Sequence, residues 1–228
     1  MLIRGRGGSA EVLLGRRHPG VRFMPGYYVF PGGRLSRADR SPSGFDENLM
    51  AAPEGVDQAT RRGLVVFARA ALRETFEETG LLLADRRVGS EATGKYPRPK
   101  TETLWKAFGR ADLAPGFRRL RLFARALTPT ESPMRFHTRF FRAEGEYLYG
   151  RLGGDGELRD LGWVPVKEAS RLPISEVTLL VLEEALTHGP GARRATGQSA
   201  GRTRPAAFFR WVGPTERLHS RAVPGRRQ

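Results

Sequence analysis

One long amphipathic segment constrains the fold of this chain more than any other feature. Between Gln58 and Thr79, the side chains that we expect to face inward recur at spacings of three and four, at Val65, Ala68, Leu72, Phe76 and Thr79. This period places them on one stripe of an α-helix, and Gly80 directly afterwards is a typical helix terminator. A helix of about six turns therefore needs other elements to cover its apolar stripe.

Short apolar runs bounded by Gly, Pro, Ser and Asp surround this helix and predict β-strands. We expect strands over residues 11–17, 27–30, 120–127, 135–143, 161–166 and 206–212. A second amphipathic helix is expected over 176–188 and a short one over 101–108, whereas residues 36–58 show no period and are interpreted as an inserted loop. Strands interspersed with two main helices predict an α/β fold with a mixed sheet.

Composition excludes several classes of protein. The chain has 228 residues and no cysteine, which excludes a disulfide scaffold and thiolate catalysis. No apolar run approaches the roughly 20 residues that span a bilayer, and residues 1–8 lack the apolar stretch of a secretory signal. We therefore expect a cytoplasmic protein that does not associate with membranes.

The net charge of +15 comes almost entirely from arginine, since lysine stands only at positions 95, 100, 106 and 167. Guanidinium groups suit phosphate recognition, although codon bias explains the excess of arginine equally well. Residues 189–228 carry nine arginines and one acid, Glu216. This basic tail predicts weak, non-specific binding of polyanions.

The richest chemistry lies at the end of the long helix, in the run Arg73-Glu-Thr-Phe-Glu-Glu-Thr-Gly-Leu. Spacings of three and four put Glu74, Glu77 and Glu78 on one side of the helix, where like charges cost a few tenths of a kcal/mol per pair. Acids at a helix C-terminus also oppose the macrodipole. A divalent cation such as Mg²⁺, which prefers oxygen ligands, would offset both costs, and Arg73 is placed to hold Glu77. The alternative is a solvated acidic face paired with arginines.

Two glycines mark a second part of the same candidate site. Gly32 and Gly33 follow the strand expected over 27–30, in the run Phe30-Pro-Gly-Gly. Glycine lets backbone approach a ligand or another segment closely. The glycines and the acidic helix end therefore predict a phosphate or metal site.

These residues resemble the Nudix hydrolases, whose motif is G-x5-E-x7-R-E-U-x-E-E-x-G-U, where U is a bulky apolar residue. The matching residues are Gly33, Arg73, Glu74, Glu77, Glu78, Gly80 and Leu81. Two features depart from the motif. The segment between Gly33 and Arg73 is 26 residues longer, and Val65 stands where the first glutamate would fall. Thr75 at the first U is a milder change.

The departures themselves resemble an inserted-motif branch of the family, which includes the peroxisomal coenzyme A diphosphatase of mammals and many bacterial relatives. The runs at Thr128-Pro and Arg135-Phe-His-Thr-Arg-Phe-Phe support this resemblance. It implies a Nudix domain over residues 1–188, with an insertion at about 34–60. Residues 189–228 would form a basic, Gly- and Arg-rich extension with a last strand at 206–212.

The resemblance also implies roles for individual residues. Glu74 and Glu78 would bind Mg²⁺ or Mn²⁺ with Glu77 as a third ligand, Arg73 would orient Glu77, and the Gly32–Gly33 backbone would face metal or phosphate. The general base is either one of these glutamates or an acid from a later loop, with Glu157 as the first candidate and Glu131 and Glu146 after it. Arg17, Arg22 and Arg135 are candidates for phosphate contacts, although ordinary surface charge explains each equally well.

Three functions remain open on the sequence alone. The first is a metal-dependent hydrolase that cleaves the diphosphate of a small nucleotide, with coenzyme A or an acyl derivative as the best substrate. The second is the same chemistry on ADP-ribose, a dinucleoside polyphosphate or an RNA end. The third is a non-catalytic ligand-binding regulator, which the valine at position 65 favours. A homodimer is one oligomeric state open to this chain.

Overall fold

The computed structural model describes residues 1–47, 58–87, 96, 98–99, 102–128, 135–187, 207–210 and 219–220. The long helix is confirmed, because α1 runs from Gln58 to Thr79. Its predicted stripe is buried, with Ala68, Leu72 and Phe76 no more than 1% exposed. Val65 is only partly buried and packs at the edge of the same core.

The larger sheet is mixed. Its strands follow the order β11-β10-β6-β7-β1-β2-β3, and β9 pairs with β2 off this path. The pairs β1–β7 and β6–β10 are parallel, whereas the other pairs are antiparallel. The strands are β1 (Leu2–Arg4), β2 (Glu11–Arg17), β3 (Tyr28–Val29), β6 (Arg121–Leu127), β7 (His137–Glu144), β9 (Leu158–Pro165), β10 (Ala207–Arg210) and β11 (His219–Ser220).

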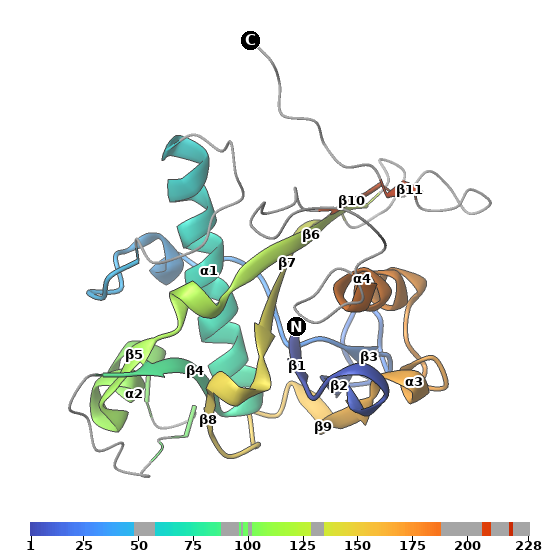
Figure 1. Cartoon of the computed structure of the whole chain (residues 1–228), viewed down its shortest axis with the longest axis horizontal. Helices are drawn as coiled ribbons and strands as arrows, with labels where there is room; N and C mark the ends of the chain where they lie inside the picture. The colour runs from blue at the N-terminus through green and yellow to red at the C-terminus, as the bar shows by residue number, and fades with distance from the viewer. Residues whose placement is uncertain are drawn as a thin grey trace.

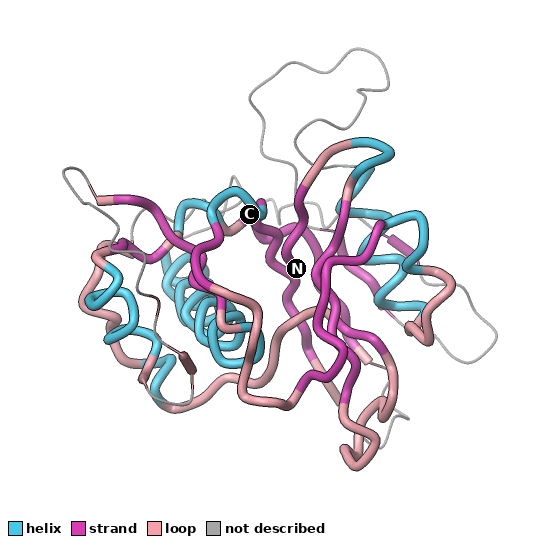
Figure 2. Tube along the Cα trace, turned by 90° about the horizontal axis from the view of Figure 1, so that it is seen from below, coloured by secondary structure: helices cyan, strands magenta, loops and turns pink. Residues whose placement is uncertain are grey.

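Helices cover both faces of this sheet, with α1 on one side and α4 (Glu176–Thr187) with the short α3 (Val166–Ala169) on the other (Figures 1 and 2). Strand β2 explains the layering, because successive side chains of a strand point to opposite faces. Leu13 packs in the core beneath α1, whereas Val12 and Leu14 pack against the α4 side. The predicted α/β fold with a mixed sheet is therefore confirmed.

A smaller sheet lies beside the long helix. It has the order β5-β4-β8, with β5 at Leu113–Pro115, β4 at Leu81–Arg86 and β8 at Leu148–Gly150. Helix α2 (Leu104–Ala111) packs with it and with α1 through buried apolar side chains. The sequence predicted none of these three strands, and it placed the short helix at 101–108, three residues too early at both ends.

Other boundaries differ slightly from those predicted. Strand β9 begins at Leu158 rather than at residue 161, which places Glu157 directly before it. The predicted strand 206–212 is confirmed over Ala207–Arg210, where β10 extends the large sheet beside β6. The insertion is described up to residue 47 and contains a short 3-10 helix at Ala38–Arg40. Most of the basic tail lies outside the described residues.

The C-terminal end of α1 is fixed by a glycine and by a loop that packs on it. Gly80 has a φ of +74°, in the left-handed region that favours glycine. Its N–H still donates to the carbonyl of Phe76 over 2.8 Å.

In the part of the chain that the structure describes, no helix is long and apolar enough to cross a membrane.

Candidate active site

The last two turns of α1 carry Glu74, Glu77 and Glu78, which we call the α1 carboxylates. Glu78 is 3% exposed, and its Oε2 accepts the backbone N–H of Gly32 over 2.7 Å. The side chain of Glu74 is 13% exposed and that of Glu77 is 40% exposed. The alternative of a solvated acidic helix face fits only Glu77, because the side chains of Glu74 and Glu78 are largely removed from water.

The Gly32–Gly33 segment lies against these carboxylates. A Cβ atom on Gly33 would stand 2.5 to 2.7 Å from the two oxygens of Glu74, which is closer than real Cβ contacts. A side chain at this position would therefore have to displace the Glu74 carboxylate. The Gly32–Gly33 backbone thus lies directly against the acidic end of the helix, whereas its predicted approach to a metal or phosphate stays a prediction.

Arg73 connects two of the α1 carboxylates. Its Nη1 lies 2.9 Å from Oε1 of Glu74 and 2.7 Å from Oε2 of Glu77. Its Nη2 donates to the backbone carbonyl of Arg34 over 2.9 Å, directly after the two glycines. The carboxylates around Arg73 raise its pKa above the usual range despite burial. The contact with Glu77 is the one that the spacing of four predicted.

The loop over residues 151–157 packs on the end of α1 and brings a fourth carboxylate to the site. The N–H groups of Gly153 and Asp155 donate to the carbonyls of Thr79 and Glu77 over 3.0 and 2.8 Å. A Cβ on Gly154 would stand 1.9 Å from the carbonyl oxygen of Glu78, so only glycine permits this packing. Glu157 lies close enough for its charge to act on Glu74 and Glu78.

Crowding of these acids changes their protonation. Burial raises the pKa of Glu78 to about 8, and the charges of Glu74, Glu157 and Asp155 add to the effect, against the lowering by the Gly32 hydrogen bond. Burial likewise raises the pKa of Glu74, although Arg73 opposes this. Desolvation and like charges both disfavour the ionised forms of Glu74 and Glu78. A further positive charge at the site would therefore stabilise their carboxylates.

These observations bear on whether the residues suit a divalent cation. The donors are all carboxylate oxygens, which hard cations prefer, and a cation would relieve the repulsion that raises the pKa values. The hydrogen bonds and ion pairs above engage one oxygen of each α1 carboxylate. Among the described residues, no group of three or more acidic or histidine side chains is already arranged as a metal site. The chemistry of the donors therefore fits a cation.

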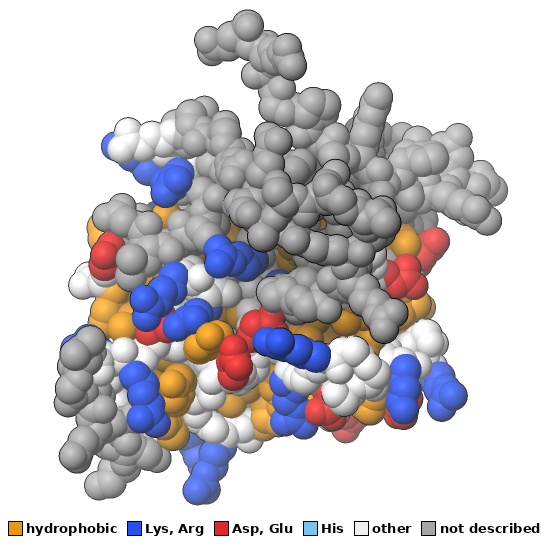
Figure 3. Space-filling view, viewed as in Figure 1, with side chains coloured by type: hydrophobic (Ala, Val, Ile, Leu, Met, Phe, Trp, Pro, Cys, Tyr) orange, Lys and Arg blue, Asp and Glu red, His pale blue; other side chains and the backbone are white. Residues whose placement is uncertain are grey.

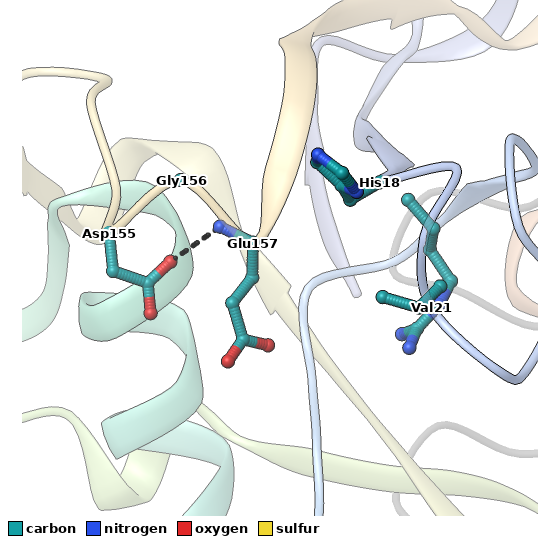
Figure 4. A pocket seen from close by; sticks show the side chains of 6 residues that line it. His18, Val21, Asp155, Gly156 and Glu157 are labelled. Atoms are coloured by element: carbon teal, nitrogen blue, oxygen red, sulfur yellow. Dashed lines mark hydrogen bonds between the residues drawn. The ribbon is translucent and has the colours of Figure 1, made fainter.

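A cavity of about 390 Å³ opens beside the carboxylates. Asp155 and Glu157 lie on one side of it and His18 and Val21 on the other (Figure 4). Arg17, one of the predicted phosphate-contact residues, also lines it. The Oδ1 atom of Asp155 accepts the N–H of Glu157 over 2.9 Å, which fixes the loop at this edge. The cavity thus borders the candidate site on the side of Glu157.

Arg22 and Arg135 are exposed, and no contact among the described residues ties either of them to the α1 carboxylates. They are adjacent in sequence to Phe23 and Phe136, whose ring centroids lie 4.7 Å apart. Sequence reasoning missed Arg34, whose guanidinium lies 5.5 Å from the Phe136 ring centroid. Its position directly after Gly33 was the available signal.

The two remaining candidates for the general base do not join the cluster. Glu146 is exposed in the short 3-10 helix before β8, and no described contact links it to the α1 carboxylates. Glu131 lies outside the described residues. Sequence reasoning also missed Asp39, which is 2% exposed and bonded to Arg73. Asp39 stands six positions after Gly33, which is the spacing of the first glutamate in the motif, so counting forward from Gly33 rather than back from Arg73 was the available signal.

Several solved structures are similar to this chain. A solved structure of a NUDIX hydrolase from Alicyclobacillus acidocaldarius is similar with a TM-score of 0.60 and 30% identity, over 84% of this chain and 91% of that one. A MutT protein from Bacillus halodurans has a TM-score of 0.46 and 14% identity, over 98% and 96% of the two chains. The NUDIX domain of Shewanella oneidensis NrtR, solved with ADP-ribose, has a TM-score of 0.45 and 13% identity, over 81% and 80%. No family model matches the chain.

Proposed function

This chain belongs to the Nudix hydrolase family, whose fold points to hydrolysis of the diphosphate in a nucleoside diphosphate derivative, and we propose that the α1 carboxylates form its catalytic site. The observation that carries the proposal is the burial of Glu78, which is 3% exposed and bonded to the N–H of Gly32 at the end of α1. Burial and the charges of Glu74, Glu157 and Asp155 together raise its pKa. Such perturbed groups cluster at functional sites.

Nudix hydrolases generally use divalent metals, and we assign this role here to Mg²⁺ or Mn²⁺. Glu74 and Glu78 would hold the cation, with Glu77 as a third ligand. Such a cation neutralises charge on the phosphate and lowers the pKa of bound water. Arg73 orients Glu77 and Glu74, while the N–H of Gly32 holds the carboxylate of Glu78 in place. Gly33 leaves room for Glu74.

Glu157 is the proposed general base. It is exposed, it follows the loop that packs on α1, and it lines the cavity beside the carboxylates. In the reaction a P–O bond forms to water and the bridging P–O bond breaks, and the carboxylate of Glu157 accepts the proton of the water. A glutamate of the α1 group is the alternative base, since several acids stand close together.

Coenzyme A or an acyl derivative is the proposed substrate. Support comes from the resemblance of the sequence to the inserted-motif branch and from the insertion itself, whose described part packs on α1 beside the site. Arg17, Arg22 and Arg135 are proposed to contact phosphates, and we add Arg34 because its backbone touches Arg73. ADP-ribose, dinucleoside polyphosphates and RNA ends are the alternative substrates.

The test is product release, followed by mass spectrometry, from coenzyme A, acyl-coenzyme A, ADP-ribose, NADH and diadenosine polyphosphates in Mg²⁺ or Mn²⁺. Phosphopantetheine should appear with the native protein and disappear with Glu78→Gln. Turnover of a different compound would keep the chemistry and reject coenzyme A as the substrate. Turnover that survives in Glu78→Gln would reject the site assignment.

A non-catalytic regulator is the second candidate, and Val65 favours it because the family motif has glutamate there. Such a protein would gain thermal stability from one of these compounds and release no product in Mg²⁺.

The proposed partners of the tail are polyanions. Lys and Arg side chains are spread over the face shown in Figure 3 with a few acidic ones among them, which suits weak binding without a dedicated groove. If RNA ends are the substrate, turnover should fall steeply with salt. We also propose a cytoplasmic location and a homodimer. The proposed domain division is a Nudix domain over residues 1–188 and an extension over residues 189–228.

A further inference from the structure

Three basic side chains gather on one face of the hairpin formed by β6 and β7. Arg125 of β6 stands directly opposite Arg139 of β7, and His137 precedes Arg139 by two positions, on the same face of its strand. Directly opposed residues of an antiparallel pair point to the same side of the sheet. Phe141 continues this face of β7 and belongs to the core that packs beneath α1. Arg125, His137 and Arg139, which we call the β6–β7 basic group, therefore lie on the α1 side of the sheet (Figure 1).

The contacts of this group leave donors available. The guanidinium of Arg139 lies 3.7 Å from the ring centroid of Phe67 on α1, a cation–π contact that uses none of its N–H groups. Nη2 of Arg125 lies 2.6 Å from Nε2 of His137. Because a guanidinium can only donate, Nε2 is the acceptor, and the proton of the neutral imidazole stands on Nδ1. Among the described residues, no group accepts a hydrogen bond from this Nδ1 or from Arg139.

The positive charges of the group oppose one another. Like charges directly opposite in a sheet are destabilising, as at Arg125 and Arg139. Burial and the charge of Arg125 lower the pKa of Arg139, while burial and the charges of Arg139 and Arg125 lower the pKa of His137. No carboxylate of the described residues forms an ion pair with Arg139 or His137. An anion at this place would relieve the repulsion, as a cation would at the α1 carboxylates.

The position of Phe67 relates the basic group to the candidate active site. Glu74 and Glu78 follow Phe67 by seven and eleven positions, which is close to two and three turns of a helix. The three side chains therefore share one stripe of α1. At 1.5 Å per residue, the level of Phe67 and of Arg139 above it lies about 10 Å along the helix axis from Glu74.

Arg34 and Phe136 connect the two places. The backbone carbonyl of Arg34 accepts from Arg73 over 2.9 Å, and its guanidinium lies 5.5 Å from the ring centroid of Phe136. Phe136 directly precedes His137 in the sequence. A substrate whose diphosphate stands at the α1 carboxylates can therefore reach the basic group with a more distant part of its nucleoside.

We propose that the β6–β7 basic group binds a phosphomonoester on the ribose of the substrate, and that this protein prefers nucleoside diphosphate derivatives that carry such a phosphate. The inference rests on the function proposed above. Arg139 presents its planar fork to the phosphate oxygens, Nδ1–H of His137 donates to the same group, and Arg125 orients His137. A ribose hydroxyl would leave the repulsion within the group uncompensated. Coenzyme A carries such a phosphate, whereas ADP-ribose and NADH do not.

Nucleotide binding in EDTA tests the inference without metal or turnover. Adenosine 3′,5′-bisphosphate, adenosine 2′,5′-bisphosphate and AMP are titrated into the native protein by calorimetry at physiological salt. One of the bisphosphates should bind at least about tenfold more tightly than AMP, the usual effect of a charge-assisted hydrogen bond. A 5′-phosphorylated dinucleotide represents an RNA end, because its 3′-phosphate is a diester with a single charge. Tighter binding of the dinucleotide than of either bisphosphate would contradict the inference.

Arg121→Gln is the matched control for Arg139→Gln. Arg121 is exposed on β6 and stands opposite Arg142, whose side chain donates to the carbonyl of Ala185 in α4. It therefore lies on the other face of the same hairpin, and its replacement removes the same charge. Arg139→Gln should reduce the preference for the bisphosphate to within about threefold, and Arg121→Gln should leave it within about twofold of the native value. An equal loss in both variants would show that net charge alone causes the preference and would overturn the inference.

Kinetics in Mg²⁺ supply a second readout. Coenzyme A should exceed dephospho-coenzyme A in kcat/KM by at least about tenfold, with the difference in KM, because the basic group lies away from the reacting phosphorus. Arg139→Gln should remove this difference while kcat on dephospho-coenzyme A stays within about threefold of native. If Arg139→Gln does not fold, His137→Ala replaces it, because His137 is exposed and its loss removes one donor. An unchanged preference in that variant would overturn the inference.

These outcomes are separable from those of the proposed function. A native protein that binds AMP and both bisphosphates equally would overturn the inference, and turnover that depends on Glu78 would still support the proposed function. A preference for a bisphosphate that is lost in Arg139→Gln, in a protein that turns over no compound, would support the binding site and overturn the proposed hydrolysis.

Discussion

Replacement of Glu78 by glutamine should stabilise the metal-free protein at alkaline pH while abolishing its activity. Glu78 is 3% exposed, and burial among other acids raises its pKa to about 8 from the 4.5 of an unperturbed glutamate. The folded protein thus retains a proton that the unfolded chain loses between these two values. The penalty that Glu78 imposes on folding is therefore smallest below pH 4.5 and grows as the pH rises towards 8.

The size of this effect follows from the two pKa values. One pKa unit corresponds to about 1.4 kcal/mol, so the raised pKa of Glu78 makes folding about 4 kcal/mol less favourable at pH 8 than at pH 4. Glutamine removes this penalty and keeps an oxygen for the N–H of Gly32. In a protein of this size about 1 kcal/mol changes Tm by roughly 2–4 °C. Glu78→Gln should therefore melt about 8–16 °C higher than the native protein at pH 8.

The assay is thermal unfolding in EDTA at pH 5 and pH 8, repeated with Mg²⁺. The variant should match the native protein at pH 5, exceed it at pH 8, and lose that advantage when Mg²⁺ stabilises only the native protein. Glu77→Gln is the matched control, since that side chain is 40% exposed and bonded to Arg73, and it should show no such gain. If Glu78→Gln is no more stable at pH 8 than at pH 5 relative to the native protein, the account of the crowded carboxylates is wrong.

Four further substitutions test the contacts of the site and of the core. Gly33→Ala should reduce turnover by at least about tenfold, because the added Cβ meets the Glu74 carboxylate. Gly63→Ala is its control, because a Cβ there meets nothing within 4 Å. It should raise the free energy of unfolding by about 0.5–1 kcal/mol. Glu157→Gln should lower kcat by about 10²- to 10⁴-fold if it is the general base, and an unchanged kcat would move that role to an α1 glutamate. Phe76→Ala should cost about 3–5 kcal/mol in urea unfolding, because Phe76 is fully buried beneath the sheet; a cost below about 1 kcal/mol would contradict this packing.

Periodicity was sufficient for the long elements of this fold. Helix α1 begins and ends at the predicted residues because its apolar stripe repeats over several turns. Strand β2 has the predicted bounds because the turn residues His18-Pro-Gly follow its apolar run directly. Strand β4 was missed because its continuous apolar run directly follows Gly80 and has no alternation to identify it. Strands β1, β5 and β8 span only three residues each, too few for a period.

The same distinction between local and long-range patterns applies to the residues of the candidate site. Helical spacing placed Glu74, Glu77 and Glu78 together, and the glycine turn before β9 identified the loop that carries Glu157. Asp39 and Arg34 could not be found in this way, because their contacts with Arg73 cross 34 and 39 positions of chain. Such pairings depend on how the insertion folds back on α1, although the spacing of six between Gly33 and Asp39 matches that of the first acid in the motif.

Anomalous scattering from crystals grown with Mn²⁺ tests the central claim most directly. The account predicts a peak within coordinating distance of Glu74 and Glu78, beside the loop that carries Glu157, and no peak there in Glu78→Gln crystals. Absence of a peak at this cluster, at Mn²⁺ concentrations that support turnover by the native protein, would contradict the assignment of the active site to the end of α1.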